Sequence, residues 1–186
     1  MRSRRAARVA PVIDPDSKDW TWVLSRTCPE CGFDASICGA LAVAALLRGN
    51  ASKWETLLAE GRITRGRSNP AKWSPLEYAC HVRDVCRIYD ERIALMLEVP
   101  DPLFANWEQD ATAVDDQYDE QDPRTVVNAL VASAEVLANR LDSLSADDWE
   151  REGSRSDGAS FTIDSISRYM IHDPIHHLWD VTVGRK

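Results

Sequence analysis

The clearest structural signal in the chain is a helix start at Lys72-Trp73-Ser74-Pro75-Leu76-Glu77-Tyr78-Ala79-Cys80-His81. Ser74 can cap the helix, Pro75 suits its first position, and Glu77 completes a Ser-x-x-Glu capping box. Residues then recur at helical spacing on one face, at Tyr78, His81, Val85, Ile88, Arg92 and Met96. The sequence therefore predicts a long helix that ends before Pro100 and carries His81 on its buried face.

Helical spacing also appears on both sides of this stretch. Asp122-Pro123 opens a helix whose apolar face consists of Val127, Leu130, Ala134, Leu137 and Leu141. A last helix, from about Thr162 to Val183, has one face formed by Ile166, Tyr169, His172, His176, Trp179 and Val183. Upstream, a helix is expected from Asp34 or Ser36 to Arg48, with its apolar face at Ile37, Leu41, Ala44 and Leu47. Gly49-Asn50 should stop it, before a shorter helical piece around Trp54.

These patterns predict an all-α protein, because helices with one apolar face each must bury those faces on one another. No pair of alternating β-branched runs joined by a tight turn is visible, so strands are not expected. Residues 1–33 contain Pro11, Pro15 and Pro29 and are expected to form an irregular leader. The bundle is expected to comprise residues 34–186.

Composition excludes several classes of function. The chain of 186 residues has a net charge of −8, which disfavours binding to nucleic acid. The basic cluster Arg2, Arg4, Arg5 and Arg8 is expected to be a solvated tail. No apolar run is long enough for a signal peptide or a membrane span, so we expect a cytoplasmic protein that binds no membrane. The five cysteines, an odd number, do not suggest a disulfide framework.

Three of the four histidines lie in His172-Asp173-Pro174-Ile175-His176-His177. Helical residues four apart are about 40° apart around the axis and about 6 Å apart along it, so His172 and His176 can reach one ion. His177 lies about 140° round the helix from His172 and should point elsewhere. Together with His81, the pair predicts a three-histidine metal site with open coordination positions. Hydrogen-bonded core histidines are the alternative.

At this point the chain resembles the DinB-like superfamily. Lys72 to His81 is similar to the tryptophan-led second helix of that family, and His172 to Asp180 resembles its last helix. The resemblance covers about residues 34 to 183 and implies an up-down-down-up four-helix bundle. It also implies that one divalent metal is bound by a histidine of the second helix and a pair from the fourth, by position His81, His172 and His176. The leader with Cys28-Pro-Glu-Cys31 departs from the family pattern, as does Pro174, which should bend the last helix.

Relatives in this superfamily include S-transferases and a maleylpyruvate isomerase that use bacillithiol or mycothiol. The resemblance thus implies a small-molecule substrate and a low-molecular-weight thiol as co-substrate. The metal is expected to be zinc, because neutral imidazoles suit it, although nickel or iron would also suit the site. The alternative is a non-catalytic metal- or ligand-binding bundle. A homodimer is expected if a helix face is left apolar.

Further residues remain open in function. Cys28-x-x-Cys31 is a turn with two reduced cysteines, a redox pair, or half of a second metal site. Trp107, Asp110 and Tyr118 lie in a long loop, where they would either line a substrate pocket or simply pack the loop. Asp173 would either orient a metal-bound imidazole or face solvent.

Overall fold

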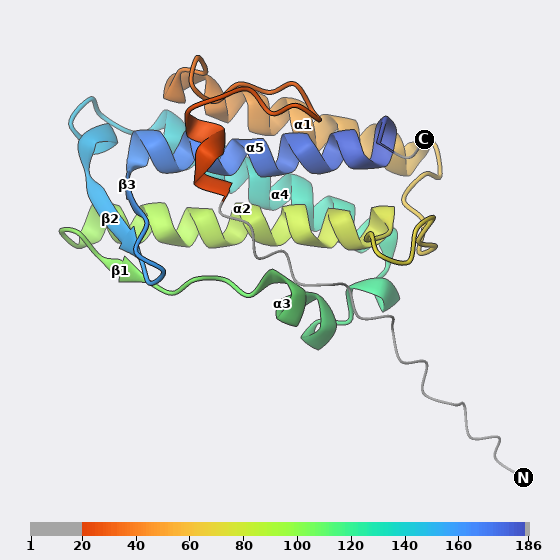
Figure 1. Cartoon of the computed structure of the whole chain (residues 1–186). Helices are drawn as coiled ribbons and strands as arrows, with labels where there is room; N and C mark the ends of the chain where they lie inside the picture. The colour runs from red at the N-terminus through yellow and green to blue at the C-terminus, as the bar shows by residue number, and fades with distance from the viewer. Residues whose placement is uncertain (1–19, 185–186) are drawn as a thin grey trace, which may run out of the picture.

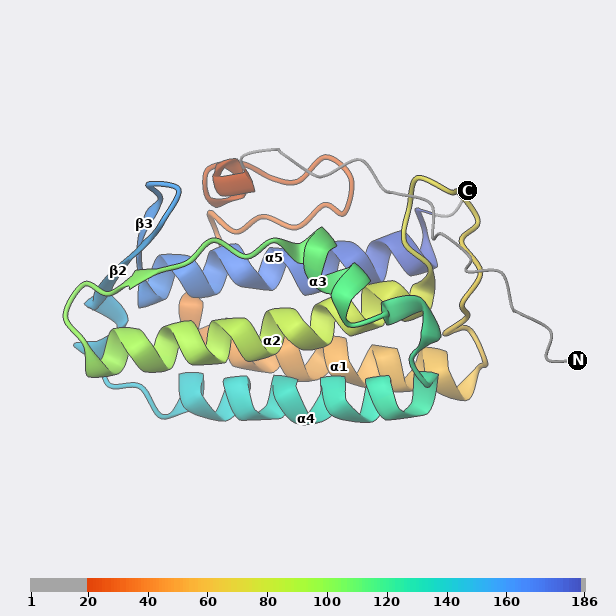
Figure 2. The same cartoon turned by 90° about the horizontal axis from the view of Figure 1, so that it is seen from below.

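The computed structural model describes residues 20–184, so the basic cluster near the N-terminus lies outside the described part of the chain. Four long helices dominate it: α1 (Val43–Ala59), α2 (Pro75–Glu98), α4 (Pro123–Asp142) and α5 (Ile163–Thr182). As Figures 1 and 2 show, α1 and α5 run in one direction and α2 and α4 in the other. Helices α4 and α5 each pack against both α1 and α2. The predicted up-down-down-up four-helix bundle is confirmed.

The ends of the helices follow from local sequence. The predicted capping box of α2 is present: the Glu77 backbone amide donates to the Ser74 hydroxyl, and the Ser74 amide donates to the Glu77 carboxylate. Asp122 caps α4 by accepting from the Thr125 amide. Helix α5 begins after Thr162 and continues through Pro174 to Thr182.

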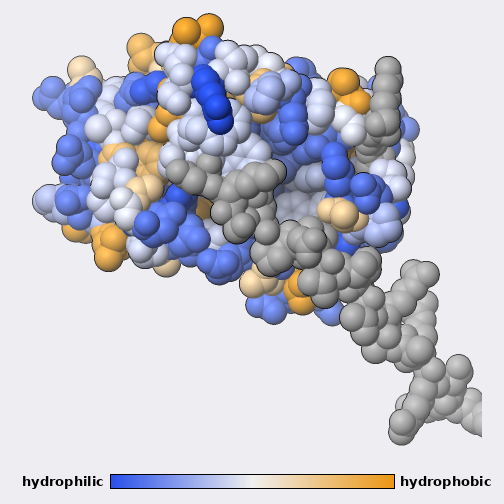
Figure 3. All heavy atoms as spheres, in the orientation of Figure 1, coloured by the Kyte–Doolittle hydropathy of each residue, from blue (hydrophilic) through white to orange (hydrophobic). Residues whose placement is uncertain are grey.

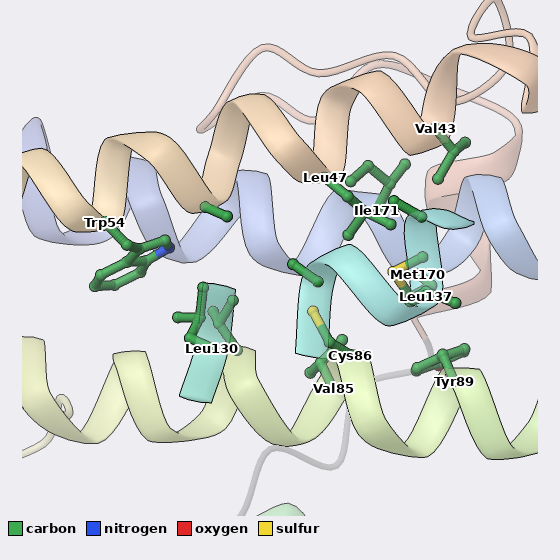
Figure 4. Close-up of a cluster of buried hydrophobic side chains, with 14 of the residues drawn as sticks. Val43, Leu47, Trp54, Val85, Cys86, Tyr89, Leu130, Leu137, Met170 and Ile171 are labelled. Atoms are coloured by element: carbon green, nitrogen blue, oxygen red, sulfur yellow. The ribbon is translucent and has the colours of Figure 1, made fainter. Parts of the chain in front are cut away.

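The bundle core is apolar and continuous. Figure 4 shows side chains from all four long helices meeting between them, among them Val43, Leu47, Trp54, Val85, Cys86, Tyr89, Leu130, Leu137, Met170 and Ile171. The outside is different: hydrophilic residues predominate on the face in Figure 3, and hydrophobic ones are scattered. Of the helices in residues 20–184, none combines the length and apolar character needed to cross a membrane.

The prediction of a helix from Asp34 or Ser36 to Arg48 is wrong. Helix α1 begins at Val43, after a short 3-10 turn at Ala40–Ala42, and Ile37 and Leu41 are 83% and 81% exposed. Gly49-Asn50 does not stop the helix. Asn50 is buried, donates its amide to the Pro174 carbonyl at 2.8 Å and accepts from the Trp54 indole at 3.0 Å. Because these bonds satisfy the Asn50 amide, the helix can bury it.

The expectation that no strands would form is also wrong. A small sheet at one end of the bundle contains β1 (Leu103–Phe104), β2 (Glu152–Arg155) and β3 (Ser160–Thr162). Strand β2 pairs in parallel with β1 and antiparallel with β3, with Gly153 opposite Phe161. These strands are too short to show an alternating pattern. A Cβ at Gly153 would lie 2.8 Å from Cγ of Met96, so the sheet can lie close against α2 only with glycine there.

The remaining short elements lie beside the bundle. They are the 3-10 turns Trp20–Leu24, Tyr118–Glu120 and Asp148–Glu150 and the short helix α3 (Gln109–Asp115). The first turn, at Trp20–Leu24, packs against α5, so residues predicted as a leader lie on the helix that carries three histidines.

Candidate metal centre

Helix α5 carries two overlapping pairs of ligand-type residues, each with a spacing of four. His172 and His176 form one pair, and Asp173 and His177 form the other. Residues that are neighbours in sequence point about 100° apart around a helix. The two pairs therefore face different surroundings, and each meets a different partner.

The first group joins Asp173 and His177 to His81 of α2, and we call it the histidine–aspartate cluster. One carboxylate oxygen of Asp173 lies 3.1 Å from Nε2 of His81 and 2.8 Å from Nε2 of His177. The three potential ligand atoms all lie within 4.8 Å of one another. His81 is fully buried, and the ring of Trp107 stacks on its imidazole with centroids 5.0 Å apart and planes 5° apart. Asp173 keeps 32% of its side chain exposed, so the cluster is open at the carboxylate.

Asp180, one turn further along α5, fixes the orientation of the rings. Its Oδ2 lies 3.0 Å from Nδ1 of His177 and 3.7 Å from Nε2 of His176. Because the Asp180 carboxylate holds Nδ1 of His177, Nε2 of the same ring is directed at the cluster. Metal-binding histidines are usually oriented in this way.

The charges within the histidine–aspartate cluster stabilise one another. Desolvation alone would raise the pKa of Asp173, but interactions with His81 and His177 outweigh it and hold the pKa well below its ordinary value. Burial would lower the pKa of His177, yet Asp173 and Asp180 together raise it to about 9. At neutral pH the carboxylate is therefore ionised and His177 is its protonated partner, so a metal ion that binds His177 must displace that proton.

The second group joins His172 and His176 to Cys28 and Cys31, and we call it the cysteine–histidine cluster. Its four potential ligand atoms also lie within 4.8 Å of one another, and Cys28 Sγ is 3.7 Å from Nδ1 of His176. A tight turn brings the two thiols together: the Gly32 amide donates to the Cys28 carbonyl, and the Cys28 amide donates to the Phe33 carbonyl. Gly32 has a φ of 74°, a conformation that favours glycine.

Each cluster contains an imidazole nitrogen with unused bonding capacity. Nδ1 of His81 and Nε2 of His172 are buried, and neither has a hydrogen-bond partner within the described part of the chain. In the cysteine–histidine cluster, burial lowers the pKa of His172 to about 4, so its ring is neutral and can coordinate a metal. Burial, with Cys28 as a close neighbour, raises the pKa of Cys31 to about 11.

A cleft of about 750 Å³ opens beside the histidine–aspartate cluster. Asp173 and Trp107 form part of its wall, so a ligand in the cleft can reach the cluster. Residues of both charges line it, including Arg92, Arg155, Glu108, Asp110 and Asp157. A smaller cavity of about 110 Å³ touches both clusters, and Trp20 lines the cleft and this cavity alike.

The predicted ligands His81, His172 and His176 are divided between these two clusters. His172 and His176 lie together as expected, with ring centroids 5.2 Å apart, but His81 lies with Asp173 and His177 instead. His177 points away from the face of His172 and His176, as expected, but toward His81, whose ring centroid is 4.9 Å from its own. In the sequence, the signal for this grouping is the pair Asp173 and His177, which has the same spacing of four as His172 and His176.

The three residues of the long loop, Trp107, Asp110 and Tyr118, lie in different surroundings. Trp107 and Asp110 line the cleft. Tyr118 does not, because it is fully buried and donates its hydroxyl to Asp84 at 2.6 Å. The structure thus places Tyr118 in the core rather than beside a substrate. All five cysteines are free, in agreement with the absence of a disulfide framework.

Comparisons with known proteins agree with this architecture. A model of the DinB superfamily matches residues 63–181. Among solved structures, YfiT from Bacillus subtilis, described as "a probable metal-dependent hydrolase with an unusual four-helix bundle topology", superposes with a TM-score of 0.66. The match covers 85% of this chain and 87% of YfiT at 14% sequence identity, so it shows a shared fold. No curated protein matches the chain.

Proposed function

Because the chain belongs to the DinB superfamily, we propose that it is a metal-dependent enzyme whose divalent metal is held by His81, Asp173 and His177. This ligand set replaces the three histidines expected from sequence. The observation that carries the proposal is that these three ligand atoms lie together and that one of the residues, Asp173, forms part of the wall of a cleft. Three protein ligands leave coordination positions open, which is the arrangement of a catalytic site.

The donor set fits such an ion. Ligands at 2.0–2.1 Å from a tetrahedral metal lie about 3.3 Å from one another. The nitrogen–oxygen distances in the cluster, 3.1 Å and 2.8 Å, require only that the side chains move apart by a few tenths of an ångström. Two imidazoles and a carboxylate suit zinc, and also nickel or iron. We propose zinc as the native metal.

The finer proposal is a transferase or isomerase that uses a small thiol, such as mycothiol or bacillithiol, against an electrophilic co-substrate. When bound, the metal would supply a Lewis acid that lowers the pKa of the thiol and so makes a nucleophile at neutral pH. The cleft volume lies within the range typical of small-molecule sites. Its mixed charges suit a polar, hydroxyl-rich thiol better than an apolar ligand.

Individual residues take defined roles in this proposal. Trp107 covers the buried face of His81 and keeps water from that side of the cluster. Arg155 is held by Asp157 at 2.7 Å and is placed to bind an anionic group in the cleft. Asp110, from α3, also lines the cleft and would contact the substrate there. A compact enzyme of this kind is proposed to act in the cytoplasm, alone or as a homodimer.

Hydrolysis is the second candidate, and it comes from the description of YfiT. The same open ligand set would serve it with water in place of the thiol. The third candidate, a non-catalytic metal-binding bundle, needs no substrate in the cleft.

One experiment separates these candidates. Zinc-loaded protein is assayed with a chromogenic electrophile plus mycothiol, bacillithiol or glutathione, and with chromogenic esters and amides in the absence of thiol. The matched variants are His177→Ala and Asp164→Asn, which alters an ion pair with Arg168 elsewhere on α5.

We expect thiol-dependent turnover in the wild type and in Asp164→Asn, and its loss in His177→Ala. Turnover without thiol that also depends on His177 would instead identify a hydrolase. No turnover with any substrate would overturn the enzymatic proposal and leave a binding protein.

A further inference from the structure

We propose that Cys28, Cys31, His172 and His176 form a second metal site, a closed structural zinc site that fastens the N-terminal segment to α5. It differs from the proposed catalytic centre in all of its ligands. Four protein ligands of this kind complete a tetrahedral shell, which is the hallmark of a structural rather than a catalytic zinc ion.

The distances in the cluster fit a tetrahedral ion. With zinc–sulfur bonds of about 2.3 Å and zinc–nitrogen bonds of about 2.05 Å, a sulfur and a nitrogen ligand lie about 3.6 Å apart. The distance from Cys28 Sγ to Nδ1 of His176 is 3.7 Å. All four ligand atoms fall within 4.8 Å of one another, so small side-chain movements close the shell.

The surroundings suit this ion as well. Nε2 of His172 is buried without a partner among residues 20–184, which is costly unless something binds it. The other side of the His176 ring is held through Nε2, 3.2 Å from Glu30 Oε2, which leaves Nδ1 directed at the cysteine. Such an outer carboxylate is the usual support of a zinc-bound histidine.

Charge balance favours the same ion. Cys28 is 2% exposed, so an uncompensated charge there would be costly. Binding of one zinc ion would release one proton from each thiol, and the two thiolates would cancel its two positive charges. The imidazoles bind as neutral ligands. The buried complex is therefore uncharged overall.

Zinc in this second site would also affect the cleft, because the N-terminal segment forms part of the cleft wall. The turn at Trp20–Leu24 supplies Trp20, Thr21 and Leu24 to the cleft wall. Trp20 also packs on both histidines of the cluster, with ring centroids 5.8 Å from His172 and 5.9 Å from His176. Zinc bound between the cysteines and α5 would hold this wall in place, although the cleft belongs to the other metal site.

The test counts metal ions and does not depend on activity. Wild type, Cys31→Ser, His177→Ala and the double variant are purified from zinc-supplemented cells without chelator and analysed for zinc per chain. Cys38→Ser is the matched control, because Cys38 is a half-buried cysteine of the same segment outside the cluster. We expect two zinc ions in the wild type and in Cys38→Ser, one in each single variant, and none in the double variant.

Replacing zinc with cobalt gives a second measurement, which can be made on the wild-type protein and so does not depend on whether a variant folds. A thiolate–cobalt charge-transfer band should appear in the wild type and persist in His177→Ala. Trypsin should also cleave after Arg26 faster in Cys31→Ser than in Cys38→Ser, because the segment is no longer fastened.

These outcomes distinguish this proposal from that for the catalytic centre. Equal zinc content in Cys31→Ser and wild type, or a cobalt-loaded wild type without a thiolate band, would overturn the structural site alone. A His177→Ala variant that keeps its full zinc content would instead count against the histidine–aspartate site.

Discussion

Asp180 offers the sharpest test of the two-site arrangement, because its carboxylate reaches a histidine of each cluster. Its Oδ2 lies 3.0 Å from Nδ1 of His177 but 3.7 Å from Nε2 of His176. Replacing Asp180 with Asn keeps the shape of the side chain and removes its charge. The two sites should therefore respond to different degrees.

The size of each response follows from these contacts. Loss of a carboxylate that supports a metal-bound histidine typically weakens metal affinity 10–100-fold, or about 1.4–2.7 kcal/mol. His177 depends on Asp180 for this support, so the histidine–aspartate site should lose that full amount. His176 has Glu30 closer, at 3.2 Å, so the cysteine–histidine site should lose less than about tenfold.

Zinc affinity can be measured by competition with a chromogenic chelator, in proteins that carry Asp180 and in proteins that carry Asp180→Asn. The Cys31→Ser background isolates the histidine–aspartate site, and the His177→Ala background isolates the other. Asp164→Asn again serves as the control on the same helix. An Asp180→Asn variant that binds zinc as tightly as the wild type at both sites, or that weakens the cysteine–histidine site more, would refute the reasoning.

Three further predictions concern the framework around the site. Asp84→Asn should lower the free energy of unfolding by about 3 kcal/mol, because it leaves buried Arg83 without its carboxylate. Hydrogen bonds from Arg83 and Tyr118 outweigh desolvation and lower the pKa of Asp84, so the ionised form stabilises the fold above the unfolded pKa. In urea titrations the difference from wild type should be constant above about pH 4 and shrink below it; a difference unchanged at lower pH would contradict this. Asn50→Ala should cost about 2 kcal/mol and lower Tm by roughly 4–8 °C in a thermal melt, because two buried partners lose their bonds; an unchanged Tm would argue otherwise. Trp107→Ala should speed the loss of zinc to a strong chelator in stopped-flow measurements, since the indole covers His81; equal rates would exclude that role.

Much of the bundle could be predicted from local sequence. The start of α2 was evident because Ser74, Pro75 and Glu77 act within a single turn of chain. Helices α4 and α5 were also identified, by Asp122-Pro123 and by apolar residues at helical spacing. The continuation of α1 through Gly49-Asn50 was not, because burial of Asn50 depends on its bond to the Pro174 carbonyl, 124 residues away. Strands of two to four residues leave too little pattern to detect.

For the candidate site, the sequence by itself determined which residue types are present: histidines on α2 and α5, two cysteines in a turn, and an aspartate between the histidines. It could not determine how they combine. Two ligand pairs overlap on α5 with the same spacing, and periodicity alone does not say which of them meets His81. Only the tertiary structure decided this, because α2 lies against the face with Asp173 and His177, while the N-terminal segment covers the face with His172 and His176. Ligand grouping is a long-range property: it depends on which elements pack together, and no local pattern records that.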